Sequence, residues 1–286
     1  MPFKVTTPSA LLPFLFLKFP DVPRTRVKKW LRLGCVSVNG KSVTRHDLAL
    51  TLKDTVDVTP HKKTALAGKS PVTIVFQDDH LVVIDKPSGL LTVATEKEKE
   101  KTVYFKLNEW LREANPDRPE RVFIVHRLDR ETSGLIVFAK NETAKYALQD
   151  SWEKTEKLYY AVVEGVPSKK EDILKSHLAQ NTILKVYATD RERPSKLAVT
   201  HYRVIRTDGK FSLLEVMPRT GRKNQIRVQL ADIGHPVAGG EKYGAQSDPA
   251  RRLALHAHQL SFRHPVSGKA LSFKSPLPSL LSRIVR

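Results

Sequence analysis

The polar loop at residues 126–134 carries the side chains best suited to chemistry. It reads HRLDRETSG, and Asp129 stands in it between Arg127 and Arg130. A neighbouring cation favours the ionised form of a carboxyl group, so we expect Asp129 to be a carboxylate held in place. Such a carboxylate can serve as a nucleophile or a base, although composition alone fits a solvated ion pair better.

Two apolar runs must hold this loop in position. Residues 122–125 (VFIV) and 135–138 (LIVF) are predicted to form buried strands on either side of it. Catalytic and binding groups concentrate on loops that rigid strands support. Helices are predicted over 102–114 and over about 141–152, the second with Asn141 as its N-cap.

The sequence of the loop favours catalysis over a solvated ion pair, because the string HRLDRETSGL resembles the central motif of the RluA-type pseudouridine synthases. The resemblance implies that Asp129 is the catalytic aspartate. It also implies an RNA substrate whose target uridine leaves its stack, and we expect Arg127 to fill the space left behind. Arg130 is expected to contact the same substrate.

A second stretch, KLYYAVVEG at residues 157–165, resembles the family's KxYxAxVxG strand. Aromatic and β-branched residues are typical of strands, so a strand is predicted here on composition as well. The resemblance implies that Tyr159 stacks on the uracil, although a strand tyrosine is usually part of the core.

A third stretch, GRKNQIRVQLADIGHP at residues 221–236, resembles the third synthase motif. The resemblance implies that Arg227 pairs with the catalytic aspartate and that Arg222 and Ile226 contact the substrate. Spacing alone leaves Arg222 as a rival partner. A guanidinium suits the role because it is always charged and can pair in bidentate fashion, whereas an isolated carboxylate in a dry pocket would take up a proton.

Three positions near this motif depart from the family pattern. Asn224 and Gln229 stand where histidines are common, and Gly240 stands where an aspartate is common. These changes leave Arg227 in place, so activity is expected, while local packing and the target sequence are put in question.

The chain carries no motif for a cofactor or a metal. Pseudouridine formation breaks the bond between ribose and a ring nitrogen and rejoins the uracil through a ring carbon, with no external electrons or phosphoryl donor. No phosphate-cradling glycine loop, HExxH or GxSxG pattern is present. His256, His258 and His264 lack the further ligands of a metal site, and we expect neither cofactor nor metal.

The charge balance predicts a nucleic acid partner. The 286 residues include 49 Lys+Arg against 30 Asp+Glu, a formal net charge of +19, which favours nucleic acid over an anionic membrane. Ribosomal RNA is favoured and transfer RNA comes second, with the protein as a monomer. A single cysteine, Cys35, and the absence of an apolar run of transmembrane length predict a cytoplasmic protein without membrane contact.

Residues 24–43, RTRVKKWLRLGCVSVNGKSV, are predicted to form a basic helix followed by a hairpin that turns at Asn39 and Gly40. A charged helix face is usually no more than a solvated surface. The string, however, resembles the small alpha-L RNA-binding domain. The resemblance implies RNA contacts by five basic residues: Arg24, Arg26, Lys28, Lys29 and Arg32.

Together these patterns predict an α+β protein. A small N-terminal α/β RNA-binding domain is expected over residues 1–58 and a linker over 59–71. The catalytic domain, over 72–286, is expected to hold a mixed, mainly antiparallel sheet with flanking helices.

Two other functions fit parts of the sequence. A non-catalytic RNA-binding or ribosome-assembly protein would explain the charge, but not a carboxylate loop between buried strands. A nucleoside hydrolase or DNA base glycosylase would use Asp129 and Glu131, whose i, i+2 spacing places both on one face of an extended segment. Loss of product on Asp129→Asn would identify an enzyme, and release of free uracil would identify a hydrolase.

Overall fold

Strands dominate the chain, which divides into two units, Met1–Lys69 and Ser70–Arg286. The structure is a computed structural model that describes residues 2–32, 34–58, 70, 72–114, 120–181, 186–189 and 195–285. The side chains of Lys29 and Ala114 are outside the description, as is all of the expected linker except Ser70. Each unit is described by itself.

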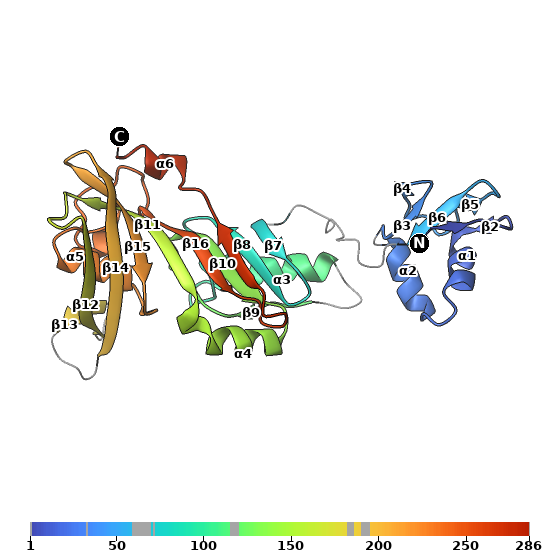
Figure 1. The fold of residues 1–286 in the computed structure, drawn as a ribbon, viewed down its shortest axis with the longest axis horizontal. Coiled ribbons are helices and arrows are strands. Elements are labelled where there is room, and N and C mark those ends of the chain that lie inside the picture. The colour runs from blue at the N-terminus through green and yellow to red at the C-terminus, as the bar shows by residue number, and fades with distance from the viewer. Residues whose placement is uncertain are drawn as a thin grey trace. The chain divides into compact units, whose positions relative to one another are not determined.

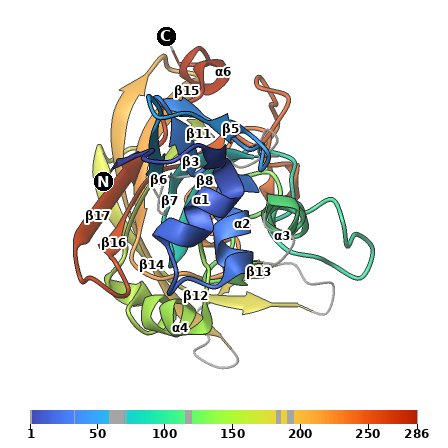
Figure 2. The same cartoon turned by 90° about the vertical axis from the view of Figure 1, so that its right-hand side faces the viewer.

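The first unit is organised around an amphipathic helix, α2 (Arg24–Arg32). Its apolar side chains Val27, Trp30 and Leu31 are buried, and α2 lies beside α1 (Leu11–Lys18) in both views (Figures 1 and 2). The apolar stripe of the helix is part of the core of this unit. Its described basic side chains lie outside that stripe and are therefore exposed to solvent.

Short strands complete this unit. They form one sheet in the order β1-β6-β3-β4 and a separate β2-β5 pair. The turn between β3 and β4 has positive φ at Asn39 (51°) and Gly40 (77°), as a type I′ turn requires, so the predicted hairpin is confirmed. The strands are β1 (Phe3–Lys4), β2 (Ser9–Ala10), β3 (Val36–Val38), β4 (Lys41–Ser42), β5 (Ala49–Leu50) and β6 (Thr55–Val58).

The second unit is built on one large sheet. Its order is β13-β12-β14-β15-β11-β16-β10-β8-β7, with β17 paired to β16 and β9 paired to β10. The pairs are antiparallel except for β10 with β16, which confirms the mixed, mainly antiparallel sheet. The strands are β7 (Thr73–Gln77), β8 (Leu81–Lys86), β9 (Phe123–Ile124), β10 (Ser133–Ala139), β11 (Glu156–Glu164), β12 (Glu171–Gln180), β13 (Val186–Thr189), β14 (Lys196–Thr207), β15 (Phe211–Pro218), β16 (Leu255–Arg263) and β17 (Ala270–Lys274).

Helices flank this sheet, as predicted. Helix α4 packs on β9 and β10, and α5 packs on β12 to β15 (Figure 1). The Asn141 side chain accepts a hydrogen bond from the Ala144 amide at 2.8 Å, which confirms the predicted N-cap of α4. The helical segments are α3 (Val103–Ala114), α4 (Glu142–Asp150), α5 (Gln225–Asp232) and α6 (Ser279–Ser282), with 3₁₀ turns η1 (Trp152–Lys154) and η2 (Glu241–Tyr243). Within the described ranges no helix is long and apolar enough to cross a bilayer.

The two apolar runs that flank the 126–134 loop form strands of different length. Strand β10 is buried throughout, as predicted. The first run forms a strand only at Phe123 and Ile124, so a four-residue strand was the wrong prediction. The Val122 amide instead donates to the Asn108 side chain at 2.9 Å, so a helix residue and not a strand satisfies it.

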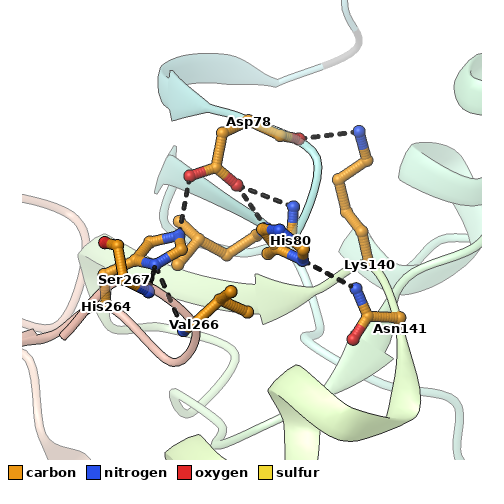
Figure 3. Close-up of polar contacts among 8 residues, drawn as sticks. Asp78, His80, Lys140, Asn141, His264, Val266 and Ser267 are labelled. Atoms are coloured by element: carbon orange, nitrogen blue, oxygen red, sulfur yellow. Dashed lines mark hydrogen bonds and ion pairs between the residues drawn. The ribbon is translucent and has the colours of Figure 1, made fainter.

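A polar network ties three turns together at one end of the sheet (Figure 3). The Asp78 carboxylate accepts from His264 Nε2 at 2.9 Å, and its main-chain oxygen accepts from Lys140 Nζ at 2.8 Å. His264 Nδ1 accepts from the amides of Val266 (3.2 Å) and Ser267 (2.9 Å). His264 thus joins the β7–β8 connection to the β16–β17 connection, and Lys140 adds the β10–α4 connection through the main-chain oxygen of Asp78.

Candidate active site

A pocket of about 450 Å³ lies between the 126–134 loop and the start of α5. Its wall includes Val125, residues 126–129 of the loop, Tyr159 on β11, and residues 222–227, which lead into α5. The volume is in the range of pockets that hold small molecules and nucleotides. The described part of the chain therefore places three predicted catalytic side chains, Asp129, Tyr159 and Arg227, around one cavity.

The carboxylate of Asp129 lies beside the guanidinium of Arg227. Arg227 Nη1 is 3.6 Å from Asp129 Oδ2, and the two side chains are 12% and 27% exposed. This distance is an ion pair, longer than a charge-assisted hydrogen bond. Arg222 also lines the pocket, but its Nε donates to the Leu197 carbonyl at 3.1 Å. Of the two arginines that spacing left open, Arg227 is the one with an ion pair to Asp129.

An aromatic ring also contacts the Arg227 guanidinium. The guanidinium carbon lies 4.9 Å from the centre of the Tyr243 ring, a cation–π distance. Asn224 Nδ2 donates to the Tyr243 hydroxyl at 2.8 Å. The Nε atom of Arg227 is buried and has no hydrogen-bond partner among the described residues. The arginine is therefore positioned mainly by a ring face and by charge.

Strand β11 carries Tyr159 into the pocket between β15 and β16. The pairing of β11 with β16 shifts register between Leu158 and Tyr159, because it skips His258 of β16, and such bulges are frequent next to active sites. Burial, and then the charge of Asp129, raise the pKa of Tyr159 well above its ordinary value. The phenol therefore remains protonated at neutral pH, able to stack and to donate a hydrogen bond.

A glycine allows the loop to close against β16. Gly134 has φ of +111°, and a Cβ atom there would lie 2.2 Å from the Ala257 carbonyl oxygen. Ala257 is paired with Gly134 on one side and with Tyr159 on the other. Only a residue without a side chain brings β10 and β11 to the same position on β16.

The main chain of the loop is held by a fully buried lysine. Lys86 Nζ donates to the carbonyls of Pro87 (2.9 Å), Leu90 (2.7 Å) and Arg130 (3.0 Å). Burial lowers the pKa of Lys86 to about 8. All three protons of the ammonium are used, so the loop position depends on this side chain being charged.

Two hydroxyl groups hold the loop at neighbouring positions. Thr92 Oγ1 donates to the Leu128 carbonyl at 2.7 Å and accepts from the Leu128 amide at 3.2 Å. Ser88 Oγ donates to the Glu131 carbonyl at 2.6 Å. These bonds flank Asp129 in sequence, and they explain how a polar loop keeps one conformation beside a cavity.

The end of the loop joins a second polar group. Ser133 Oγ accepts from Arg252 Nη2 at 2.7 Å and is paired with His256 Nδ1 at 2.9 Å. His256 and His258 both contact the main-chain oxygen of Ser275. In the part of the chain that the structure describes, no three His, Cys, Asp or Glu side chains come together as a metal site.

The other predicted substrate contacts are divided between the pocket and the surface. Arg127 is exposed at the pocket and Ile226 is buried in its wall. Arg130 is outside the wall and pairs with Glu131 through Nε and Oε1 at 2.6 Å. The structure therefore does not bring Asp129 and Glu131 together in the pocket as a hydrolase pair would require.

The three departures from the family pattern are accommodated locally. Asn224 has φ of 54° and reaches the Tyr243 hydroxyl. Gln229 is buried and donates to Ser176 Oγ at 3.0 Å. A Cβ atom at Gly240 would lie 2.6 Å from the Val237 carbonyl oxygen, so this chain packs its backbone where a larger residue would need space.

Sequence reasoning missed the supporting residues. Lys86 and Thr92 stand in or near the KPSGLL stretch, and Tyr243 follows the third motif. Nothing in the spacing says that a lysine is buried or that a tyrosine lies under an arginine, because both facts depend on strands distant in sequence.

The basic residues expected to bind RNA are on the surface of α2. Arg24, Arg26, Lys28 and Arg32 are exposed, and the side chain of Lys29 is outside the described residues. Arg24 lies over the Phe16 ring with its guanidinium carbon 5.2 Å from the ring centre.

Comparison with known proteins gives a consistent result. Residues 80–232 match the RNA pseudouridylate synthase family model. An RNA pseudouridine synthase of Chlorobaculum parvum is 34% identical over 96% of this chain and 92% of its own. The ribosomal large subunit pseudouridine synthase D of Nitrosomonas europaea is 32% identical over 93% of this chain and 80% of its own. Among solved structures, human RNA pseudouridylate synthase domain containing 4 has a TM-score of 0.61 at 26% identity, covering 73% of this chain and 90% of that one.

Proposed function

The chain belongs to the RluA-type RNA pseudouridine synthases, and we propose that it isomerises uridine in ribosomal RNA with Asp129 as the catalytic carboxylate and Arg227 as its partner. One observation carries the proposal: Arg227 Nη1 lies 3.6 Å from Asp129 Oδ2 in a pocket that Tyr159 also lines. The match is to an enzyme family, so a purely RNA-holding protein does not account for the chain.

In this proposal, Asp129 acts on the ribose of an extruded uridine. It adds to the anomeric carbon as a nucleophile while the bond from that carbon to the uracil ring nitrogen breaks, or it removes a sugar proton as a base while the same bond breaks and a glycal forms. In both cases the bonding electron pair leaves with the uracil, which is then rejoined through its ring carbon. Arg227 supplies the positive charge that compensates the carboxylate while water is excluded. Tyr159 stacks on the uracil, and its protonated phenol can help move the proton of the ring carbon as the base is rejoined.

The RNA enters by electrostatic attraction in the same proposal. Extruding a base costs roughly a few kcal/mol, and Arg127 at the mouth of the pocket stacks in its place. Residues 1–58 act as an RNA-binding domain through the exposed cations of α2, residues 59–71 act as a linker and 72–286 as the catalytic domain. Ribosomal RNA is preferred to transfer RNA because the named relatives include synthases of the ribosomal large subunit. The enzyme works as a cytoplasmic monomer.

The test is a map of pseudouridine in total RNA from cells that have or lack this gene. Deletion should remove pseudouridine at discrete ribosomal positions, and the wild-type gene should restore it. Asp129→Asn should not restore it, with activity reduced by at least about 10³-fold. Asp150→Asn, a matched change at an exposed position at the end of α4, should restore it fully.

Each contrary result has a separate meaning. Restoration by Asp129→Asn would remove Asp129 from the chemistry. Loss of pseudouridine only in transfer RNA would refute the ribosomal target, and release of free uracil would refute isomerisation.

A further inference from the structure

The active-site pocket continues beyond the predicted catalytic residues to a second cluster. His126, Trp152 and Lys157 line the same cavity as Asp129. Lys157 and Tyr159 are two apart on β11, so their side chains are on the same face of the strand, about 7 Å apart along it. The cluster therefore lies next to the position proposed for the uracil, within reach of a neighbouring nucleotide.

Lys157 is a half-buried cation without an anionic partner in this cluster. Its Nζ donates to the Trp152 carbonyl at 3.3 Å and lies 5.5 Å from the centre of the indole ring. Burial lowers its pKa, and the charge of Glu153 opposes that effect. No carboxylate of the described residues is within ion-pair distance of Nζ. An ammonium has three donors and only one is used here, so this cation is available to an anion.

His126 adds a neutral donor beside this cation. Its Nε2 accepts from the Val137 amide at 3.1 Å, and its ring stacks on Trp152 with centres 4.3 Å apart. Burial, and then the charge of Lys157, lower the pKa of His126 to about 3. The ring is therefore neutral at physiological pH, and because Nε2 accepts, its proton is on Nδ1.

The charges of the pocket wall favour a polyanion. The cations Arg127, Lys157, Arg222, Lys223 and Arg227 face a single carboxylate, that of Asp129, among the wall residues that the structure describes. Arg227 is committed to Asp129, whereas Lys157 has only neutral neighbours at bonding distance. A phosphodiester would supply the missing negative charge.

We propose that His126, Trp152 and Lys157 form a phosphate subsite that binds the backbone of the nucleotide adjoining the target uridine. Lys157 Nζ contacts the phosphate, Trp152 fixes the lysine stem and the His126 ring, and His126 Nδ1 donates the second hydrogen bond. The subsite rests on the proposed function, because it identifies which part of the RNA the same pocket holds.

The first measurement is the salt dependence of RNA binding. The probe is a synthetic RNA stem-loop built around the uridine identified by mapping, and binding is measured on the Asp129→Asn background so that no turnover occurs. Lys157→Met should weaken binding about tenfold and reduce the slope of log K against log salt by about 0.7, the value for one single-strand phosphate. Lys157→Arg should restore both. Lys154→Met, an exposed lysine of η1 outside the pocket wall, should change neither.

The second measurement identifies the phosphate. A methylphosphonate, which removes the charge of a single phosphate, is placed in turn on each side of the target uridine. At one position it should weaken binding of the Asp129→Asn parent about tenfold and should not weaken binding of the Lys157→Met form further. Thermal melting shows that the variants are folded, and Lys157→Gln replaces Lys157→Met if the latter is not.

The subsite is refuted if Lys157→Met and Lys154→Met have equal salt slopes, or if every methylphosphonate weakens both proteins equally. Failure of the proposed function is a different result: the wild-type protein would then leave the stem-loop uridine unchanged. If the wild-type protein converts the uridine but Lys157→Met leaves the slope of log K against log salt unchanged, only the phosphate subsite is refuted.

Discussion

The two sides of the active-site pocket are built in different ways. On the loop side, Lys86, Ser88 and Thr92 bond to main-chain groups around Asp129. On the helix side, Arg227 has a ring face beneath it and a 3.6 Å ion pair in front of it, and its buried Nε has no partner among the described residues.

This contrast indicates a division of labour between a fixed carboxylate and an adjustable guanidinium. Preorganised groups accelerate a reaction because they need not be reordered when charge develops. Hydrogen bonds at catalytic sites are often long without substrate and shorten in the complex. We expect the Asp129–Arg227 pair to close on uridine while the loop remains where Lys86 holds it.

Among changes that leave Asp129 in place, the largest effect should follow from changing Arg227. Arg227→Lys keeps a positive charge but loses the planar fork and the ring contact, so kcat/KM should fall about 100-fold. Steady-state assays on the mapped RNA measure this. Arg222→Lys is the matched control, because Arg222 bonds to the Leu197 carbonyl, and it should cost only a few-fold. A larger loss for Arg222→Lys would reverse the assignment of the partner.

A smaller effect, with a pH signature, should come from the fixed side. The pKa of Lys86 is lowered by burial to about 8, so above that pH its amine keeps two donors for three carbonyls. We expect kcat to fall as pH rises through about 8. Lys86→Met should lower kcat about tenfold and abolish this pH limb, while Ser88→Ala, which removes one bond to the Glu131 carbonyl, should keep the limb.

The contribution of Lys86 to stability should change with pH in the direction opposite to its effect on kcat. Between about pH 8 and the ordinary lysine value of 10.5, the unfolded chain binds the proton and the folded chain does not. The contribution of this one group to the free energy of unfolding therefore increases with pH across that window and is least favourable below it.

A fall in kcat near pH 8 that persists in Lys86→Met would show that another group titrates there.

The smallest effect should come from the ring under Arg227. Tyr243→Leu removes the aromatic face and should lower kcat about fivefold with little change in KM, because it affects positioning and not RNA contact. Tyr243→Phe keeps the aromatic face and loses the hydroxyl that accepts from Asn224, so most of the activity should be retained. Equal losses in both variants would mean that the hydroxyl, and not the ring face, supports Arg227.

Local sequence was sufficient for several parts of this protein. The turn at Asn39 and Gly40, the N-cap at Asn141 and the span of α3 follow from short-range preferences, and the structure has them as predicted. The strand before the active-site loop was overestimated at four residues, because the Asn108 side chain satisfies the Val122 amide. No local pattern reveals a partner from a distant helix.

By itself, the order of residues in three motifs determined the family and the α+β class, since those strings and the alternation of apolar residues are local properties of the chain. Tertiary structure alone decided that Arg227 and not Arg222 lies at Asp129, that Glu131 turns to Arg130 outside the pocket, and that Lys86 is buried under the loop. The physical reason is that each of these facts depends on how strands far apart in sequence meet in one sheet. Gly134 and Ala257, paired across β10 and β16, set that meeting point by a contact that no spacing along the chain encodes.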